Sequence, residues 1–365
     1  MGHQRTIDHA VAAMRTAGVD ALLIGPGADL RHLTGYAAHA LERMTLLVLR
    51  ADGRHALVVP ELERAAAVAG TDAVPVRTYA ETADPADTVA EVLDGVPADA
   101  RLGVGDQLWA RFLLALQQVR PGARWQLASH VTRDVRMVKD AAGLDGLRRA
   151  GAAIDAVHRR MGEFLVPGRT EQEAGRAIAA AMREEGHDDV DFVIVGSGPN
   201  GASPHHETSD RVLSAGDAVV VDTGGPVAGW FSDCTRNYVL GSAPDGYEAA
   251  HQVLWDAQRA AVAHVRPGVT AASVDAAARQ VIADAGYGDA FIHRTGHGIG
   301  LEVHEEPYIT AGNDLRLQPG MTFSVEPGIY LEGRYGMRIE DIVAVTEDGV
   351  ERLNTTDTAL VVLPA

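Results

Sequence analysis

Pro167-Gly168-Arg169-Thr170 opens one helical stretch of this chain, and Pro267-Gly268-Val269-Thr270 opens another, 100 positions later. The two stretches run to Gly186 and Gly286, so the same offset holds at both ends. Self-similarity over such a length is typical of a repeat architecture. The sequence therefore predicts a domain built from two copies of one half, with a chance alignment of glycine and proline as the alternative.

The repeat continues beyond the helices and takes in reactive residues. Small drifts in the offset, to 99 and then to 104, are what loop insertions produce. The matched positions are Phe192, Gly201 and His205 with Phe291, Gly300 and His304, and Gly216, Asp222 and Gly224 with Gly320, Glu326 and Gly328. Because acidic and imidazole groups align together, this pattern argues against chance.

Length and charge restrict the class of protein. The 365 residues suffice for two domains, and 46% hydrophobic with 22% charged residues is ordinary for a globular protein. The net charge of -18 is spread along the chain, which argues against a nucleic acid or an anionic membrane as a partner.

Cysteine content and apolar runs bear on location. Cys234 is the one cysteine, so no internal disulfide can form. No apolar run approaches the roughly 18 residues that span a bilayer, and the N-terminus lacks the apolar core of a signal peptide. We therefore expect a cytoplasmic protein.

The first third of the chain alternates between helical and strand patterns, which indicates an α/β domain. Helices are predicted at 7–18 and 87–93, and strands at 21–24, 46–49, 56–59 and 102–104. A long amphipathic stretch, Leu144 to Phe164, opens a second region that holds both copies of the repeat. We predict two domains, 1–132 and 133–365.

Local patterns in the second region place carboxylates on strands. Thr170 and Glu173 form a capping-box signature at a helix start. The β-branched run 219–221 ends on Asp222, and 322–325 ends on Glu326, so both acids are predicted at strand ends. Alternation through 337–345 puts Arg338 and Glu340 on one face of a strand.

Four acidic residues and one imidazole suggest a metal site. The carboxylates of Asp222, Asp233, Glu326 and Glu340 would repel one another inside a domain unless a cation compensated them. With His297 as a fifth ligand, this oxygen-rich set suits Mn²⁺, Co²⁺ or Fe²⁺ better than a structural Zn²⁺.

The chain resembles the pita-bread metallopeptidases, the family of methionine aminopeptidase, aminopeptidase P and prolidase. The resemblance covers nearly the whole chain, and the order of the motifs makes it specific. The motifs are Ser232-Asp233-Cys234-Thr235-Arg236, His293-Arg294-Thr295-Gly296-His297-Gly298-Ile299-Gly300, His304-Glu305-Glu306-Pro307, Val325-Glu326-Pro327-Gly328 and Arg338-Ile339-Glu340-Asp341.

This resemblance implies an α+β chain: a C-terminal pita-bread domain with a pseudo-two-fold repeat, preceded by a smaller α/β domain like that of creatinase and prolidase. It further implies that Asp222, Asp233, His297, Glu326 and Glu340 bind two divalent metal ions, with Asp233 and Glu340 bridging. Mn²⁺ is the first expectation for both ions, and Co²⁺, Fe²⁺ or Zn²⁺ remain alternatives.

The preceding domain and the histidines are similar to those of the proline-peptidase branch. His205 and His293 correspond to residues that flank the substrate, and His304 to one that hydrogen-bonds the scissile carbonyl. The implied hypothesis is hydrolysis of an Xaa-Pro bond by a hydroxide between the metals, with His304 stabilising the oxyanion and Glu326 moving the proton. Arg338 either binds a substrate carboxylate or orients Glu340.

Neighbouring residues are expected to have plainer roles. His206 is predicted to be a solvated neighbour of His205, and Cys234 to pack in the core. Residues 196–201 lack the lysine of a phosphate-binding loop, so a backbone turn is predicted. Asn237 stands where relatives often have threonine, a departure that bears on the groups behind the ligands.

Two other functions stay open. The same scaffold can carry a lyase or another reaction on a small molecule, or it can bind without turnover. The sequence does not separate a dipeptidase from an aminopeptidase acting on peptide N-termini. A homodimer is expected from the resemblance alone.

Overall fold

The computed structural model describes residues 2–71 and 74–365. The chain forms two compact units, residues 1–136 and 137–365. Among the described residues, no helix combines the length and the apolar character needed to cross a membrane.

A six-stranded mixed sheet forms the centre of the first unit, with the strand order β4-β3-β2-β1-β5-β6. β1 pairs antiparallel with β2 and parallel with β5. The strands are β1 (Ala21–Ile24), β2 (Leu46–Arg50), β3 (His55–Pro60), β4 (Val76–Tyr79), β5 (Arg101–Val104) and β6 (Arg124–Leu127). The predicted strands at 21–24, 46–49, 56–59 and 102–104 are confirmed to within two residues.

Helices cover both faces of this sheet, because side chains alternate between two apolar clusters. In β1, Leu22 and Ile24 face the cluster that contains α1, while Ala21 and Leu23 face the cluster that contains α4 and α5. The helices are α1 (His3–Ala17), α2 (Ala28–Thr34), α3 (Arg64–Gly70), α4 (Pro85–Val92), α5 (Ala110–Val119) and α6 (Ser129–Met137). The α/β prediction for this region is confirmed.

The second unit contains a four-stranded sheet (β17-β9-β8-β7), a five-stranded sheet (β11-β10-β12-β15-β16) and the hairpin β13-β14. Its helices are α7 (Ala141–Arg159), α8 (Met161–Phe164), α9 (Glu171–Glu184), α10 (Tyr247–His264) and α11 (Ala271–Asp284). Its strands are β7 (Phe192–Ser197), β8 (Ala218–Val227), β9 (Trp230–Leu240), β10 (Gly296–Gly298), β11 (Glu305–Ile309), β12 (Thr322–Val325), β13 (Gly328–Leu331), β14 (Tyr335–Arg338), β15 (Asp341–Val345), β16 (Val350–Arg352) and β17 (Val361–Leu363).

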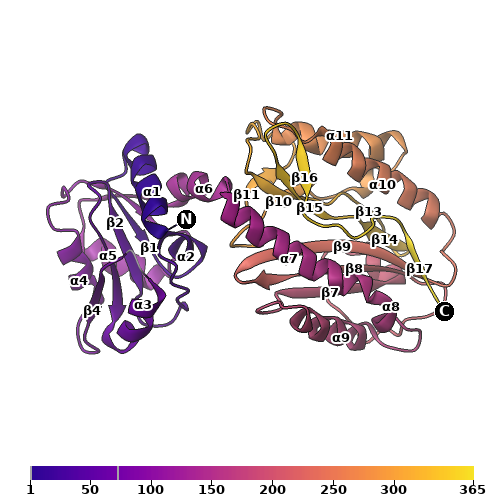
Figure 1. The fold of residues 1–365 in the computed structure, drawn as a ribbon, viewed down its shortest axis with the longest axis horizontal. Coiled ribbons are helices and arrows are strands. Elements are labelled where there is room, and N and C mark those ends of the chain that lie inside the picture. Colours follow the sequence, from indigo (N-terminus) through magenta and orange to yellow (C-terminus); the bar gives the residue numbers. More distant parts are fainter. Residues whose placement is uncertain (1, 72–73) are drawn as a thin grey trace. The chain divides into compact units, whose positions relative to one another are not determined.

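Each half of this unit has its own apolar core. One cluster packs α7, α8 and α9 against β7, β8 and β9, and the other packs α10 and α11 against β12 and β15. Figure 1 shows α10 and α11 side by side on one side of the sheets, with α9 next to β7 on the other. The sheets between these helix layers are where the carboxylates lie.

Matching hydrogen bonds confirm the internal repeat. The Gly168 amide donates to Leu213 and the Gly268 amide donates to Leu317, both at 2.9 Å. Thr170 and Thr270 also form equivalent isolated bridges, to Val212 and Arg316. Both threonines cap their helices, and the capping box of Thr170 with Glu173 is complete. The offsets of 100 and 104 read from the sequence are thus the offsets of the hydrogen-bond pattern.

Two local predictions were wrong. Asp222 lies inside the ten-residue strand β8, not at a strand end. The stretch 337–345 is two strands, since β14 ends at Arg338 and β15 begins at Asp341, which leaves Glu340 between them. The long amphipathic stretch from Leu144 to Phe164 is helical on both sides of Arg160, in α7 and α8.

Candidate metal centre

The five predicted ligands come from five separate segments of the second unit. Asp222 lies on β8, Asp233 on β9 and His297 on β10, whereas Glu326 directly follows β12 and Glu340 precedes β15. All are buried except Glu326, whose side chain is 14% exposed. The sequence separates these groups by up to 118 positions, and the two sheets bring them together.

The spacing of Asp222 and Asp233 follows from strand pairing. In the β8-β9 ladder, Gly224 lies opposite Asp233, and Asp222 lies opposite Thr235. Residues two apart on a strand share a face, so both carboxylates point to the same side of the sheet. The tight β8-β9 turn therefore converts a spacing of eleven residues into one acidic surface.

Distances between the ligand atoms are short. Nε2 of His297 lies 3.6 Å from Oδ2 of Asp233 and 3.3 Å from Oε1 of Glu326. Asp233, His297 and Glu340 each offer one ligand atom, and these atoms all lie within 4.8 Å of one another. A cation can therefore be reached by at least three side chains at once.

Three carboxylate oxygens have no hydrogen-bond partner among the described residues, although they are buried. They are Oδ1 of Asp222, Oδ1 of Asp233 and Oε1 of Glu340. A buried charged oxygen without a donor costs free energy, of order 1–3 kcal/mol or more each. A divalent cation bound to these oxygens would supply the positive partner that no hydrogen-bond donor provides, so the donor set fits a metal.

The raised pKa values of the carboxyl groups in the site support the same conclusion. Burial, together with the charges of neighbouring carboxylates, raises the pKa of Asp233 and Glu340 well above the usual range. Burial likewise raises the pKa of Glu326 to about 7, although the positive charge of Arg338 opposes the shift. Without a cation, these acids would hold protons at a pH where surface carboxylates do not.

His297 is held as a neutral ligand. Burial, reinforced by His304, lowers its pKa to about 3. Its Nδ1 lies 3.1 Å from the Gly298 carbonyl, which can only accept, so Nδ1 carries the proton and Nε2 faces the carboxylates with its lone pair.

Glycines on both sides of His297 permit this position. A Cβ atom at residue 296 would lie 1.9 Å from the Ser324 carbonyl oxygen, and one at residue 298 would lie 2.3 Å from the backbone of Glu306. The backbone of β10 therefore approaches its neighbours more closely than any side chain allows.

Two hydroxyl groups that hydrogen-bond the proposed ligands were not predicted from the sequence. The Thr235 hydroxyl donates to Glu340 at 2.7 Å and accepts from Nε of Arg338 at 3.0 Å. Alternation along β9 puts Thr235 on the same face as Asp233, so the sequence pattern could have predicted that Thr235 lies in the site. The Ser324 hydroxyl accepts from the His297 amide and donates to Glu326, both at 3.0 Å.

Arg338 is bound through all three of its nitrogens. Nη2 pairs with Asp222 at 2.5 Å, Nε donates to Thr235, and Nη1 donates to the Tyr330 hydroxyl at 2.8 Å. Asn237, the departure from the family pattern, exchanges two hydrogen bonds with the backbone of Arg338. The guanidinium therefore contacts Asp222 directly and reaches Glu340 through the Thr235 hydroxyl.

Three further predicted histidines lie around the carboxylates. The ring of His304 meets the ring of His297 edge-on, with centroids 4.1 Å apart. His293 hydrogen-bonds Tyr330 at 3.0 Å, and burial lowers its pKa to about 4. His205 follows Pro204, whose carbonyl accepts a hydrogen bond from Nη1 of Arg338 at 3.3 Å, and Nη1 also donates to Tyr330, the partner of His293.

The loop that carries His205 is anchored by Glu171, at the start of α9. This fully buried carboxylate accepts hydrogen bonds from the amide and hydroxyl of Ser197, from the amide and hydroxyl of Ser209, and from Asn200. His206 also binds it, at 2.7 Å. The prediction that His206 is solvated was wrong. Its side chain is only 14% exposed, and its contact with Glu171 ties the loop to α9.

In the other half of the repeat, a second buried carboxylate also anchors a histidine-bearing segment. Asp275, on α11, accepts from the amide and the hydroxyl of Thr295 and pairs with Arg279. Arg279 in turn donates to the carbonyl oxygens of Phe291 and His293. Each half of the repeat thus uses one helix carboxylate to hold the segment that carries site histidines.

The remaining local predictions fit the structure. Cys234 is fully buried in an apolar cluster, and burial raises the pKa of its thiol. Residues 198–202 form a 3₁₀ turn after β7.

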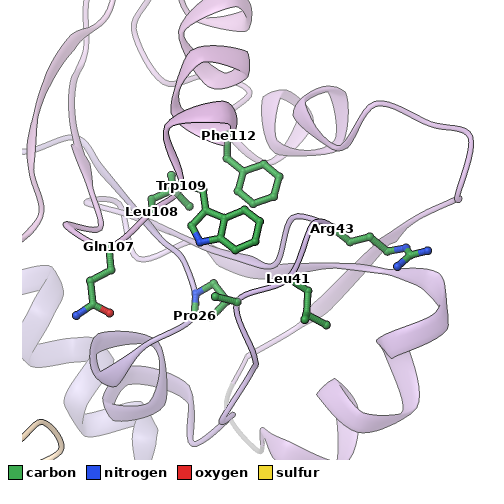
Figure 2. Close-up of a pocket in the computed structure, with 8 residues that line it drawn as sticks. Pro26, Leu41, Arg43, Gln107, Leu108, Trp109 and Phe112 are labelled. Atoms are coloured by element: carbon green, nitrogen blue, oxygen red, sulfur yellow. The ribbon is translucent and has the colours of Figure 1, made fainter.

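Figure 2 shows an apolar pocket elsewhere, in the first unit. It is lined by Pro26, Ala40, Leu41, Arg43, Gln107, Leu108, Trp109 and Phe112. This lining contains no carboxylate, imidazole or thiol, so it does not provide ligands of the predicted kind.

Comparisons with known proteins agree with this geometry. Residues 145–347 match the model of metallopeptidase family M24, and residues 7–138 match that of the creatinase/prolidase N-terminal domain. The chain is 51% identical to a probable dipeptidase PepE of Mycobacterium tuberculosis, over 99% of this chain and 97% of that one. It is 34% identical to an Xaa-Pro dipeptidase of Lactobacillus delbrueckii, over 95% and 96%. The crystal structure of dipeptidase PepE from Mycobacterium ulcerans matches with a TM-score of 0.94 at 51% identity, covering 100% of this chain and 98% of that one.

Proposed function

The chain belongs to metallopeptidase family M24, and on that premise we propose that it hydrolyses the Xaa-Pro bond of short peptides with two divalent metal ions. The observation that carries this proposal is the buried ligand set, in which three carboxylate oxygens lack any partner among the described residues. The bond specificity is supported by similarity to an Xaa-Pro dipeptidase along 95% of the chain.

The metal ions would be held by Asp222, Asp233, His297, Glu326 and Glu340. When bound, such ions supply an activated water nucleophile at neutral pH and polarise a carbonyl oxygen. Carboxylate ligands with a single imidazole favour Mn²⁺, with Co²⁺, Fe²⁺ and Zn²⁺ as alternatives.

Glu326 is proposed to move the proton of the reaction. Its side chain is 14% exposed, the one partly open side chain of the five, so the carboxylate can accept a proton from water and pass it to the leaving nitrogen. The Ser324 hydroxyl, at 3.0 Å, orients Oε1 of this carboxylate.

Three histidines are proposed to handle the substrate. His304 is open to solvent and lies against His297, so it can donate a hydrogen bond to the scissile carbonyl as negative charge develops there. His205 and His293 would flank the substrate on either side. A bond before proline has no N–H, so recognition through imidazole donors to the carbonyl suits this substrate.

The test is the release of the N-terminal amino acid from alanylproline and from an alanylprolyl tripeptide by Mn²⁺-loaded protein, with alanylalanine as the control. Cleavage of either proline peptide but not of alanylalanine supports the proposal. Two bound metals without cleavage of any proline peptide would contradict it and favour a small-molecule reaction, and absence of metal binding would favour a binding protein.

A further inference from the structure

Arg294 lies in the segment that carries the site histidines, one residue after His293 and three before His297. It is partly buried, and its guanidinium stacks on the ring of Tyr308, on β11, with 4.3 Å from Cζ to the ring centroid. Among residues 2–71 and 74–365, no carboxylate is recorded within ion-pair distance of this guanidinium. A stacked, partly desolvated arginine without an acidic partner is free to bind an anion.

Strand pairing places Arg294 beside the proposed metal centre. Gly296 on β10 lies opposite Ile309 on β11, so His297 and Tyr308, the adjacent residue on each strand, point to the same face of the sheet. His304, which precedes β11, is exposed and meets the ring of His297 edge-on, with centroids 4.1 Å apart. The guanidinium stacked on Tyr308 therefore lies on the face of the sheet that carries His297.

Arg338, the arginine that the sequence suggested for a substrate carboxylate, is already occupied. Asp222, Thr235 and Tyr330 bind its three nitrogens, and only 4% of the residue is exposed. A substrate carboxylate could bind there only by displacing Asp222, which would then lose its buried counter-charge.

We propose that Arg294 binds the free C-terminal carboxylate of a dipeptide substrate and thereby selects dipeptides over longer peptides. This inference rests on the proposed function. A guanidinium binds a carboxylate through two parallel hydrogen bonds, and the Tyr308 ring holds its plane in place, which reduces the entropy lost on binding. A dipeptide has its carboxylate on the residue after the scissile bond, where a longer peptide has a neutral amide.

The test compares two substrates that differ only in this charge, alanylproline and alanylprolinamide, with Mn²⁺-loaded full-length protein. Wild type should favour the acid. Arg294→Met should lower kcat/KM for the acid by roughly 100-fold, the loss typical of a desolvated charge pair, while changing kcat/KM for the amide less than about threefold. Arg294→Lys should give an intermediate preference, because it keeps the charge but loses the paired hydrogen bonds.

Arg259→Met is the matched control, since Arg259 stacks on Trp255 at the same 4.3 Å but on α10. It should leave the acid-to-amide ratio at the wild-type value. Equal wild-type rates on both substrates, or an Arg294→Met variant that keeps the preference, would overturn the inference while the proposed function stood. Should Arg294→Met fail to fold, a wild-type preference in Arg294→Lys would overturn it equally. Wild-type protein with two metals that cleaves neither substrate would overturn the proposed function, and the inference with it.

Discussion

At the scale of single residues, the site depends on close backbone approach as much as on ligand chemistry. Gly296 faces the Ser324 carbonyl, where an added Cβ would lie 1.9 Å from the oxygen. The same Ser324 binds both the His297 amide and the Glu326 carboxylate. A side chain at residue 296 would therefore push apart the two strands that position two proposed ligands.

We predict that Gly296→Ala destabilises the fold by about 3 kcal/mol and weakens metal binding, because backbone atoms cannot yield as a flexible side chain would. Gly349→Ala is the control, since its Cβ would meet nothing nearer than the Thr346 hydroxyl at 3.9 Å, and its effect should stay within about 0.5 kcal/mol. Chemical denaturation and metal titration of both variants measure this. Equal stability of the two variants would refute the packing argument.

At the scale of elements, two helices position the histidine-bearing segments through buried carboxylates. Glu171 on α9 holds the loop of His205, and Asp275 on α11 holds the segment of His293. Because a carboxylate only accepts hydrogen bonds, it can gather several amides and hydroxyls around one point. The segments that carry these histidines are thus fixed by helices from which none of the five proposed ligands comes.

Replacing Glu171 should loosen the His205 loop. Glu171→Gln places an amide donor among existing donors, so we predict a loss of about 3 kcal/mol in stability and faster backbone amide exchange in residues 197–209. Asp155→Asn is the control: Asp155 is equally buried and accepts from the amide and hydroxyl of Thr355, far along the chain from this loop. Hydrogen exchange in 197–209 should match wild type in this control. Unchanged exchange in Glu171→Gln would disprove the anchoring role.

The same carboxylate predicts a pH dependence. Burial by itself would raise the pKa of Glu171, but hydrogen bonds from Ser197, Ser209 and His206 outweigh it and lower the pKa to about 2, from 4.5. A pKa depressed by folding contributes stability that is complete above about pH 4.5 and is lost as the pH falls toward 2. The stability difference between wild type and Glu171→Gln should therefore shrink on acidification below pH 4.5. A difference that stays constant over this range, measured by denaturant unfolding, would count against it.

At the scale of the whole molecule, most of the acidic charge is spread along the chain, but a small part of it is buried, where charge is least tolerated. The chain carries a net charge of -18, and four of its carboxylates meet inside the second unit. Arg338 is the one guanidinium paired with a proposed ligand carboxylate among the described residues. The remaining negative charge requires protons or cations, so bound metal is expected to stabilise the fold.

Metal removal should destabilise the protein. At free metal about 100 times the dissociation constant, binding to the folded state contributes about 2.7 kcal/mol, so chelation should lower Tm by roughly 5–10 °C at neutral pH. In Asp233→Asn, which removes a proposed bridging ligand, the same chelator should shift Tm far less. Calorimetry with and without chelator measures both, and an equal shift in the two proteins would argue against Asp233 as a ligand.

Much of this architecture could be predicted from the sequence, because repeats and alternating side chains are visible in short stretches of it. The matched offsets at Thr170 and Thr270 predicted the hydrogen-bonded repeat, and the family motifs placed five ligand candidates that the fold does bring together. The roles of those residues, and the domain boundary at 132/133, stay predictions. The Glu171 anchor could not be foreseen, since its partners lie 26 to 38 residues away and meet only through tertiary packing. The break between β14 and β15 at Glu340 was not predicted either, because the side-chain alternation continues through it. There Glu340 accepts a hydrogen bond from Thr235 on β9.

The most direct test is the rate of proline release from alanylproline as the metal content is raised from none to two ions per chain. Metal-free protein should release no proline, the rate should rise with bound metal, and Asp233→Asn should be inactive. Release at the same rate by metal-free protein, or none from protein shown to hold two ions, would contradict the claim that this buried carboxylate cluster is a metal-dependent peptidase site.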